Sequence, residues 1–600
     1  MSWERGYALN KQDTSPASKL RNSRAEDRLD SWKEIAAYLK REVRTVQRWE
    51  KAAGLPVHRL QVDKQGTVYA YKSELDEWFR ERRSQLEPEY EEGAGTSTRQ
   101  GMRWLIVGGL LALVGLVSVG AYLAGNGRWF HKHATTQKIK LAVLPFVNLS
   151  GDPSQRYFSD GMTDEMITQL GRMQPERLGV IAAESSKLLA GKSIAEVGRT
   201  LDVQYALEGS VRRSGNQVRI DVQLIQVSDQ THLWADSYTR DLVDVLRVQD
   251  QIAATVASQI RVAIPVSAVR ANAAAHAASR PVSPEAYDAY LRGRFEWTGQ
   301  GDLHKSIEAY QEAIEKDPQF ALAYAGLASS YTRRGMAPLD DLSPTEIQPM
   351  ARQAAEHALR LDPQLAEAQA VLANISLRYD WDFQAAEREF RRAFALDPTN
   401  VFAHDNYIHY PITRNQLQQA LEETTRMLDL DPSWPQFNAF RAQIFYYARD
   451  YDSAIATTRG IIKQYPTYWL SYFWLGSSYR EKKMDREAVE AFAQGRKLAS
   501  DNPAMIAMYG HSLALSGDAA GARKALAELR RLAQLRYVSS LYFAAIYTGL
   551  GEKSTALDWL DKAYAERSDR LIYLGVEPAA DPLRSEPLFR DLLRRIGLTP

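Results

Sequence analysis

The stretch from residue 472 to residue 492, YFWLGSSYREKKMDREAVEAF, decides the fold of the larger part of this 600-residue chain. Gly476 and Tyr479 precede Ala488 and Phe492 at a spacing that fits two helices joined by a short turn. Small residues let paired helices approach closely, and aromatic side chains fill the gaps between them. The stretch therefore predicts one helix pair of a stacked array, with its apolar faces buried against neighbouring pairs.

Related units recur on both sides of this stretch. A proline, usually after Asp, returns at intervals of 45, 35, 34, 34 and 37 residues. These prolines are Pro318, Pro363, Pro398, Pro432, Pro466 and Pro503. The period resembles that of the tetratricopeptide repeat (TPR). The resemblance implies an all-α TPR solenoid over residues 285–600, with a C-terminal cap and a concave surface that binds a protein or peptide partner.

A mixed α/β domain is predicted over residues 138–265. The run 140–147 is apolar and β-branched, which indicates a buried strand, and polar and apolar residues alternate over 218–224, which indicates a strand with one wet face. The phrases AVLPFVNLSGDPSQRYFSDGMTDEMITQL and YALEGSVRRSGNQVRIDVQLIQVSDQTHLWADSY resemble the TolB N-terminal-like domain. The resemblance implies a binding or interaction module, not a catalytic one.

An acidic cluster in this domain comprises Asp160, Asp164 and Glu165. Such carboxylates could form a metal site or an acid/base pair if they converged in a pocket. The structural alternative is an Asp-Gly turn followed by Thr163 as a helix cap, with the acids in the first helical turn. We favour the structural interpretation.

The sequence of the N-terminal part predicts a disordered leader over residues 1–29 and a small folded module over residues 30–83. Ser31 and Glu34 have the spacing of a capping box at the start of a helix. A second helix, a strand pair and a last helix capped by Ser73 are expected to follow. The module has 12 Lys+Arg and 9 Asp+Glu, and its net charge is therefore +3.

The second predicted helix of the module, 43–53, has two different faces. Its apolar residues Val43, Val46 and Trp49 share one face. Long hydrogen-bond donors fall at i, i+3, i+4 and i+7 on the opposite face, beginning at Arg44. Arg and Gln side chains can make bidentate contacts with guanine and adenine edges. This pattern favours a helix that lies in the major groove of DNA.

The order WKEIAAYL, RTVQRWE, GLPVHRL and GTVYAYKSELDEWF resembles the MerR/excisionase-type winged helix-turn-helix. The resemblance implies that the residues facing the bases are Arg44, Thr45, Gln47 and Arg48. It implies that the residues contacting phosphates are Arg41, Lys51, Arg59 and Lys64. The alternative is that the basic face is merely solvated, or that the module binds protein.

Residues 104–124, WLIVGGLLALVGLVSVGAYLA, contain no charged side chain. About 20 helical residues cover the ~30 Å hydrocarbon core of a bilayer. The sequence therefore predicts one transmembrane helix after a linker over 84–103, and the alternative is a buried core helix. The basic residues that flank the predicted span are more numerous on its C-terminal side, which favours a cytoplasmic location for that side. A DNA-binding module, however, must lie in the cytoplasm to reach DNA, and this argument decides the orientation that we expect. We expect a bacterial inner-membrane protein with a cytoplasmic N-terminus and periplasmic C-terminal domains.

Composition excludes several classes of protein. The chain has 75 Lys+Arg, 74 Asp+Glu, a net charge of +1 and no cysteine, which excludes disulfides, zinc fingers, Fe–S clusters and thiol nucleophiles. The sequence contains no GxxxxGK[ST], no GxGxxG before a helix, no HExxH and no GxSxG. We therefore expect that the protein is not an enzyme and that it has neither a cofactor nor a metal site.

Together these features predict a multidomain chain: a winged helix-turn-helix, one transmembrane helix, a mixed α/β domain and a TPR solenoid. The function expected from this order is a membrane-anchored one-component transcriptional regulator that binds DNA and senses or binds a protein partner outside the cytoplasm. A homodimer is one of the oligomeric states that this function allows. The alternative is an envelope TPR scaffold that assembles protein complexes without binding DNA.

Overall fold

The structure of the chain is a computed structural model. It describes residues 27–29, 31–39, 43–53, 55–62, 65–78, 138–173, 175–260, 282–297, 301–336 and 342–599. The chain divides into two compact units, Met1–His131 and Lys132–Pro600. Each unit is described by itself below.

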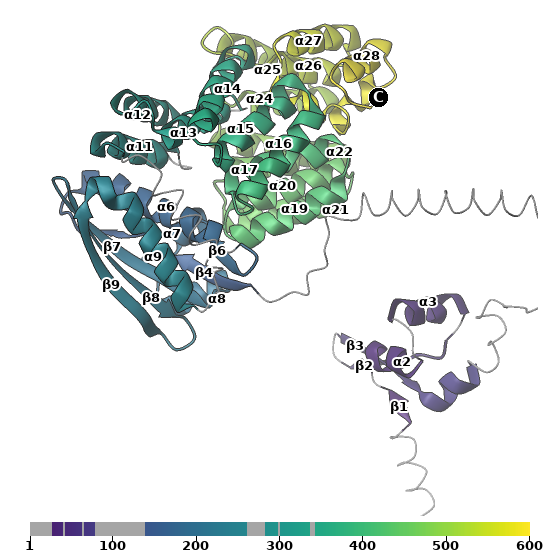
Figure 1. Cartoon of the computed structure of the whole chain (residues 1–600). Helices are drawn as coiled ribbons and strands as arrows, with labels where there is room; N and C mark the ends of the chain where they lie inside the picture. Colours follow the sequence, from purple (N-terminus) through teal and green to yellow (C-terminus); the bar gives the residue numbers. More distant parts are fainter. Residues whose placement is uncertain are drawn as a thin grey trace, which may run out of the picture. The chain divides into compact units, whose positions relative to one another are not determined.

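The first unit contains two helices and a small antiparallel sheet with strand order β1-β3-β2 (Figure 1). Its elements are β1 (Arg28–Leu29), α2 (Trp32–Tyr38), α3 (Val43–Ala53), β2 (His58–Val62), β3 (Gln65–Tyr71) and a helical segment over 72–78. A core that includes Ile35, Val46, Ala70, Leu75 and Trp78 holds the helices against the sheet. From α2 onward the order of helices and strands is the one expected from the sequence, whereas β1 was not expected.

One helix start in this unit agrees with the prediction, whereas the start of the last helix and the start of the folded unit differ from it. Ser31 is the N-cap of α2, as predicted, and its side chain accepts a hydrogen bond from the Glu34 backbone N–H. The last helix, however, begins at residue 72, so Ser73 lies inside it and is not its cap. The side chain of Asp27 accepts hydrogen bonds from the backbone N–H and the hydroxyl of Ser73. Asp27 and β1 lie in the expected leader, so the folded unit begins before residue 30.

The first half of the second unit is a sheet domain with strand order β6-β4-β7-β8-β9. Strand β4 pairs in parallel with β6 and β7, whereas β7, β8 and β9 form an antiparallel meander. The strands are β4 (Ile139–Val143), β5 (Val147–Asn148), β6 (Leu178–Ile181), β7 (Tyr205–Ser214), β8 (Gln217–Gln226) and β9 (Thr231–Asp241). The helices are η1 (Pro153–Gln155), α6 (Arg156–Met173), α7 (Ala183–Leu188), α8 (Ile194–Leu201), η2 (Leu242–Asp244) and α9 (Val245–Gln259).

Along β8 one face of the sheet is buried and the other is polar, as the alternation in this strand predicts, whereas at β4 and β6 the opposite face also packs on α8. Val218, Ile220, Val222 and Leu224 are buried in a cluster that also contains residues of α6 and α9, which cover this face (Figure 1). The polar residues between them point to the opposite face, where Gln223 pairs with Glu208.

The second half of the unit is an array of antiparallel helix pairs (Figure 1). Its helices are α11 (Pro284–Trp297), α12 (Leu303–Lys316), α13 (Ala321–Arg334), α14 (Pro344–Leu361), α15 (Ala366–Ile375), η3 (Ser376–Asp380), α16 (Phe383–Leu396), α17 (Val401–Tyr407), α18 (His409–Thr413), α19 (Leu417–Leu430), α20 (Pro435–Tyr447), α21 (Tyr451–Gln464), α22 (Trp469–Glu481), α23 (Asp485–Leu498), α24 (Pro503–Leu515), α25 (Ala519–Leu532), α26 (Ser540–Gly549), α27 (Lys553–Ala565), η4 (Asp569–Tyr573), η5 (Pro578–Leu583) and α28 (Pro587–Arg595).

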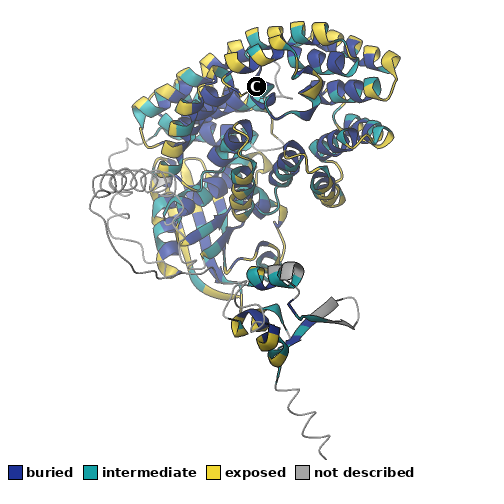
Figure 2. Cartoon of the chain, turned by 90° about the vertical axis from the view of Figure 1, so that its right-hand side faces the viewer, coloured by how far each residue is buried: buried dark blue, intermediate teal, exposed yellow. Residues whose placement is uncertain are grey.

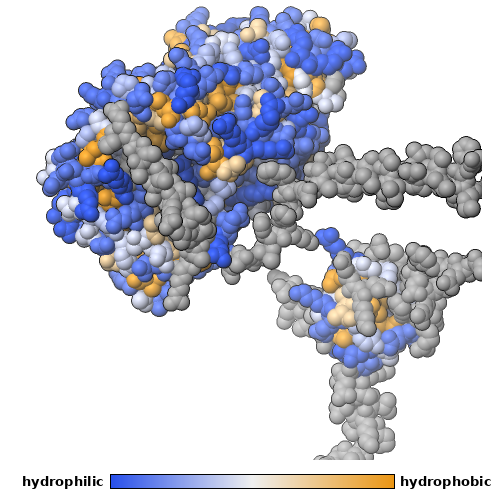
Figure 3. Space-filling view, in the orientation of Figure 1, coloured by the Kyte–Doolittle hydropathy of each residue, from blue (hydrophilic) through white to orange (hydrophobic). Residues whose placement is uncertain are grey.

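Residues 472–492 lie in α22 and α23, and their small and aromatic side chains are in contact as predicted. Phe492 and Ala488 are fully buried, and a Cβ placed on Gly476 would lie 2.8 Å from Cδ2 of Phe492. Trp474 is also buried, which supports a packing role for this aromatic cluster. Burial follows the inner faces of the helix pairs (Figure 2), and hydrophilic residues dominate the surface with smaller hydrophobic patches between them (Figure 3).

The sheet domain and the first repeat share one hydrophobic core, because α6 packs directly on α11. The hydroxyl of Tyr290 donates to Glu165 Oε1 at 2.7 Å, and a Cβ on Gly161 would lie 2.8 Å from Cδ2 of Leu291. The hydroxyl of Tyr157 donates to Asp288 Oδ1 at 2.7 Å. The two predicted domains are therefore continuous at this junction.

The expected transmembrane architecture requires a correction. Within the described residues, every helix is too short or too polar to cross a membrane. The predicted span at 104–124 lies outside those residues. The expected fold class, which placed a transmembrane helix between the modules, and the expected single-pass inner-membrane localisation are therefore not supported. The supported fold is a mostly helical repeat region joined to a sheet domain.

Candidate functional site

Helix α3 carries the residues for which the sequence predicts contacts with DNA bases. Val46 is fully buried, and the indole of Trp49 packs beside that of Trp78 with ring centroids 5.9 Å apart. On the other side of the helix, Arg44 is exposed and Gln47 is partly exposed. The helix thus buries its apolar face and leaves donor side chains at the surface, as the pattern predicts.

The remaining predicted residues are placed only in part. Thr45 is partly exposed on α3, and the backbones of Arg48 and Lys51 lie on the same helix. The backbone of Arg59 lies on β2, whereas Arg41 and Lys64 lie outside the described residues. No comparison tests these eight residues, so their roles remain predictions.

A cluster of rings on the strand pair was not foreseen from the sequence. The imidazole of His58 stacks on Tyr69 with centroids 5.1 Å apart and lies 2.6 Å from the carboxylate of Glu74. The guanidinium of Arg28 lies over the ring of Tyr69 at 4.2 Å. These residues come from β1, β2, β3 and the last helix, and no local sequence pattern links them.

The acidic cluster of the sheet domain has a structural role, but its details differ from expectation. Helix α6 begins at Arg156, so Thr163 lies inside the helix, where its hydroxyl donates to Ser159 O and accepts from the Phe146 backbone N–H. Glu165 accepts the hydrogen bond from Tyr290 described above. Glu165 therefore joins the sheet domain to the repeats, whereas Asp160 pairs with Arg156 and Asp164 with Lys187 inside the domain, and none of the three lies in the first turn of α6.

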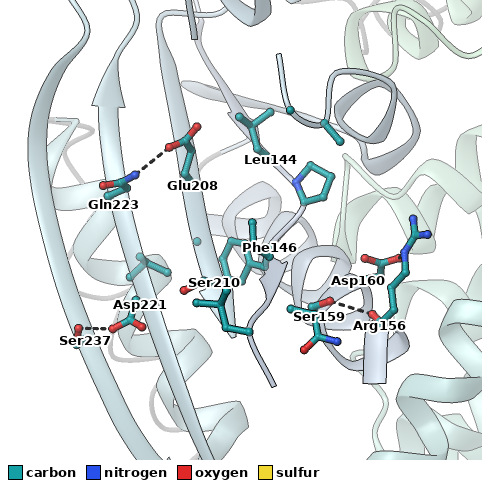
Figure 4. A pocket seen from close by; sticks show the side chains of 18 of the residues that line it. Leu144, Phe146, Arg156, Ser159, Asp160, Glu208, Ser210, Asp221, Gln223 and Ser237 are labelled. Atoms are coloured by element: carbon teal, nitrogen blue, oxygen red, sulfur yellow. Dashed lines mark hydrogen bonds and ion pairs between the residues drawn. The ribbon is translucent and has the colours of Figure 1, made fainter. Parts of the chain in front are cut away.

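A broad pocket of about 1390 Å³ lies over the polar face of β7 and β8 (Figure 4). Glu208 and Asp221 lie on the strands on one side, and Asp160 pairs with Arg156 on the other, with Nε–Oδ2 at 3.3 Å. Burial raises the pKa of Asp160 above its ordinary value. The described lining residues include no His, Cys or Tyr, and the hydroxyl of Ser237 donates to Asp221 Oδ1 across two neighbouring strands.

A second cavity of about 1010 Å³ lies where α6, β6 and α7 meet the repeats. Backbone contacts close one side of it, since the Ala182 N–H donates to Leu430 O at 2.8 Å. The Ser185 hydroxyl and N–H both donate to Asp431 Oδ1 in the same corner. No sequence pattern predicts this cavity, because its walls come from residues more than 200 positions apart.

Family comparisons place two parts of the chain. Residues 136–255 match the family model described as HilA/YgeH-like transcriptional regulator, second domain. Residues 441–468, which run from the middle of α20 to just past the end of α21, match a tetratricopeptide repeat model. The resemblance of the sheet domain to TolB N-terminal-like proteins, and that of the first unit to MerR-type proteins, are not supported by these matches.

Single relatives cover only part of the chain. A "Putative adenylate cyclase 3" of Rhizobium meliloti (strain 1021) is 42% identical over 197 residues, which is 32% of this chain and 32% of that protein. The match therefore spans about a third of the curated relative.

Solved structures match the repeats only loosely. A human IFIT1 dimer with m7Gppp-AAAA is 14% identical over 54% of this chain and 88% of that chain, with a TM-score of 0.37. Pseudomonas aeruginosa pilF is 17% identical over 36% of this chain and 92% of that chain, with a TM-score of 0.28. TM-scores this low carry no information on function. The chain is thus similar to HilA/YgeH-like transcriptional regulators over its sheet domain and to TPR proteins over part of its repeats.

Proposed function

We propose that the protein is a transcriptional regulator that binds DNA through α3 and binds a protein partner through its helical repeats. The observation that carries this proposal is the match of residues 136–255 to a domain of HilA/YgeH-like transcriptional regulators. A regulator needs a separate element that contacts DNA, and α3 has the surface chemistry for that role. The repeats supply an extended surface of the kind that TPR proteins use for peptides.

The proposed DNA contact follows from the two faces of α3. Arg44 and Gln47 project from the face opposite the buried Val46, and both side-chain types can contact base edges in the major groove. The strand pair β2–β3 follows the helix and would lie against the phosphate backbone as a wing. Two copies of the chain would present two such helices to half-sites about one helical turn apart, ~34 Å.

Immunoprecipitation of the tagged full-length chain across the genome tests this proposal. We expect discrete peaks for the wild type that disappear in the R44A/R48A double variant. The matched control is R240A/R247A, which removes two exposed arginines from the sheet domain instead. Peaks that persist in R44A/R48A would refute the role of α3. A lack of peaks in the wild type, together with a stable complex of other proteins, would favour the scaffold alternative.

We also propose that the chain is not an enzyme. The support is the absence from the whole sequence of the nucleotide-binding and hydrolase motifs named above. The name of the Rhizobium relative belongs to a protein of which only 32% is matched. A cyclase assay of the full chain with ATP and divalent metal tests this point directly.

A further inference from the structure

The cavity between the sheet domain and the repeats has a strongly acidic lining. Its walls contain eight carboxylates and three guanidinium groups, and they include no lysine. The carboxylates are Asp164, Glu165, Glu184, Asp362, Glu367, Asp397, Asp405 and Asp431. Lys187, outside the lining, offsets part of this charge, because its Nζ lies 3.5 Å from Asp164 Oδ1 and 3.6 Å from Glu184 Oε1. The remaining carboxylates lie between α6 on one side and α11, α17 and α19 on the other.

The basic residues of the cavity already have partners. Arg172 Nε lies 3.2 Å from Asp397 Oδ2, and Arg294 Nη1 lies 3.6 Å from Glu367 Oε2. Arg333 Nη1 donates to the carbonyl oxygen of Trp297 at 2.6 Å. These three guanidinium groups are therefore engaged and do not offer an open site for an anion.

Two of the acidic residues, by contrast, have oxygen atoms without a partner among the described residues. Asp431 is 1% exposed, and its Oδ2 is buried without a hydrogen bond although its Oδ1 is bonded to Ser185. Oδ1 of Asp405, on α17, is also buried and without a hydrogen bond. Burying such an oxygen is costly unless a donor reaches it.

Aromatic rings complete the site. Trp297, Phe320, Phe402 and Trp434 line the cavity, and the rings of Trp297 and Phe402 have centroids 6.1 Å apart. Aromatic faces attract cations, most strongly when water is excluded. The guanidinium of Arg333 already lies over the ring of Trp297 at 5.1 Å, so this wall holds one cation against an aromatic face within the protein itself.

We propose that this cavity binds an organic cation, an ammonium or guanidinium group carried on an apolar body. The cation donates to the free oxygen of Asp405 and, where Asp431 is ionised, to its Oδ2, and its body packs on the aromatic wall. The volume of about 1010 Å³ is in the range of small-molecule sites. Because the walls come from both the sheet domain and the repeats, the bound ligand stabilises their junction. The inference is independent of DNA binding by α3.

Calorimetric titration of the full-length protein tests this proposal with agmatine and spermidine as probes. Adipate, a dicarboxylate, is the anionic control. We expect saturable binding of at least one of the two cations and none of adipate. In D405N, affinity for that cation decreases about tenfold or more, because a carboxylate partner is lost from a dry site. W297F replaces the indole with a ring that attracts cations less strongly, and it also weakens binding.

Glu490→Gln is the matched control, because it removes one exposed carboxylate from α23, outside the cavity. It should bind the cation as the wild type does. Circular dichroism melting curves establish that D405N and W297F are folded before binding is compared. The proposal is overturned if neither cation binds the wild type, if adipate binds in their place, or if folded D405N binds as tightly as Glu490→Gln.

Discussion

Replacing Gly476 with alanine presses a methyl group against the ring of Phe492. The new Cβ would lie 2.8 Å from Cδ2 of Phe492, which is itself fully buried. Overpacking of this kind costs ~1–3 kcal/mol, whereas alanine in place of glycine inside a helix stabilises by ~1 kcal/mol. We therefore expect a net loss of about 1 kcal/mol in the local stability of α22 and α23.

Gly460 provides the matched control. It lies inside α21, where an added Cβ would meet no atom within 4 Å, so G460A should stabilise its helix or leave it unchanged. Amide hydrogen exchange read by mass spectrometry reports the local opening free energy of each helix, which suits an array that does not unfold in one step. The double variant G476A/F492L should recover part of the loss. Faster exchange in G460A than in G476A would refute this account of helix packing.

Three further predictions concern other parts of the chain. Ser31→Ala removes the N-cap of α2 and should lower the free energy of unfolding of the first unit by about 1 kcal/mol. Hydrogen exchange of the α2 amides measures this loss, and unchanged protection of these amides would contradict the capping role of Ser31. Burial first, and then Glu184, raises the pKa of Asp431 to about 7, so the junction should lose stability as pH rises from 3.8 to about 7. Exchange of the α19 amides measures this loss, and D431N should flatten it; an equal slope in D431N would count against it. The full chain with ATP and Mg²⁺ or Mn²⁺ should make no cyclic AMP above a boiled sample, and sustained turnover would disprove the proposal of a non-enzyme.

Much of the fold could be predicted because its signals are local. The pairing of Gly476 with Phe492 follows from residue size and spacing within one repeat, and the alternation in β8 follows from the pleat of a strand. The amphipathic pattern of α3 likewise predicts which side is buried. In each case the decisive residues lie within about 20 positions of one another.

The junction and its cavity could not be predicted, because they depend on contacts between distant residues. Glu165 meets Tyr290 across 125 positions, and Ser185 meets Asp431 across 246. The prediction for Thr163 was wrong for a local reason: Asp152 already caps η1, which leads directly into α6, so the helix begins before the cluster. The hydropathy of residues 104–124 favoured a membrane span, but no described helix supports one.

The most direct test of the central claim is the binding of the full-length chain to a DNA fragment enriched by immunoprecipitation, measured by fluorescence anisotropy at fixed salt. The account predicts that the wild type and R240A/R247A bind this fragment far more tightly than a scrambled one, and that R44A/R48A does not distinguish the two. Equal discrimination by R44A/R48A and the wild type would contradict it.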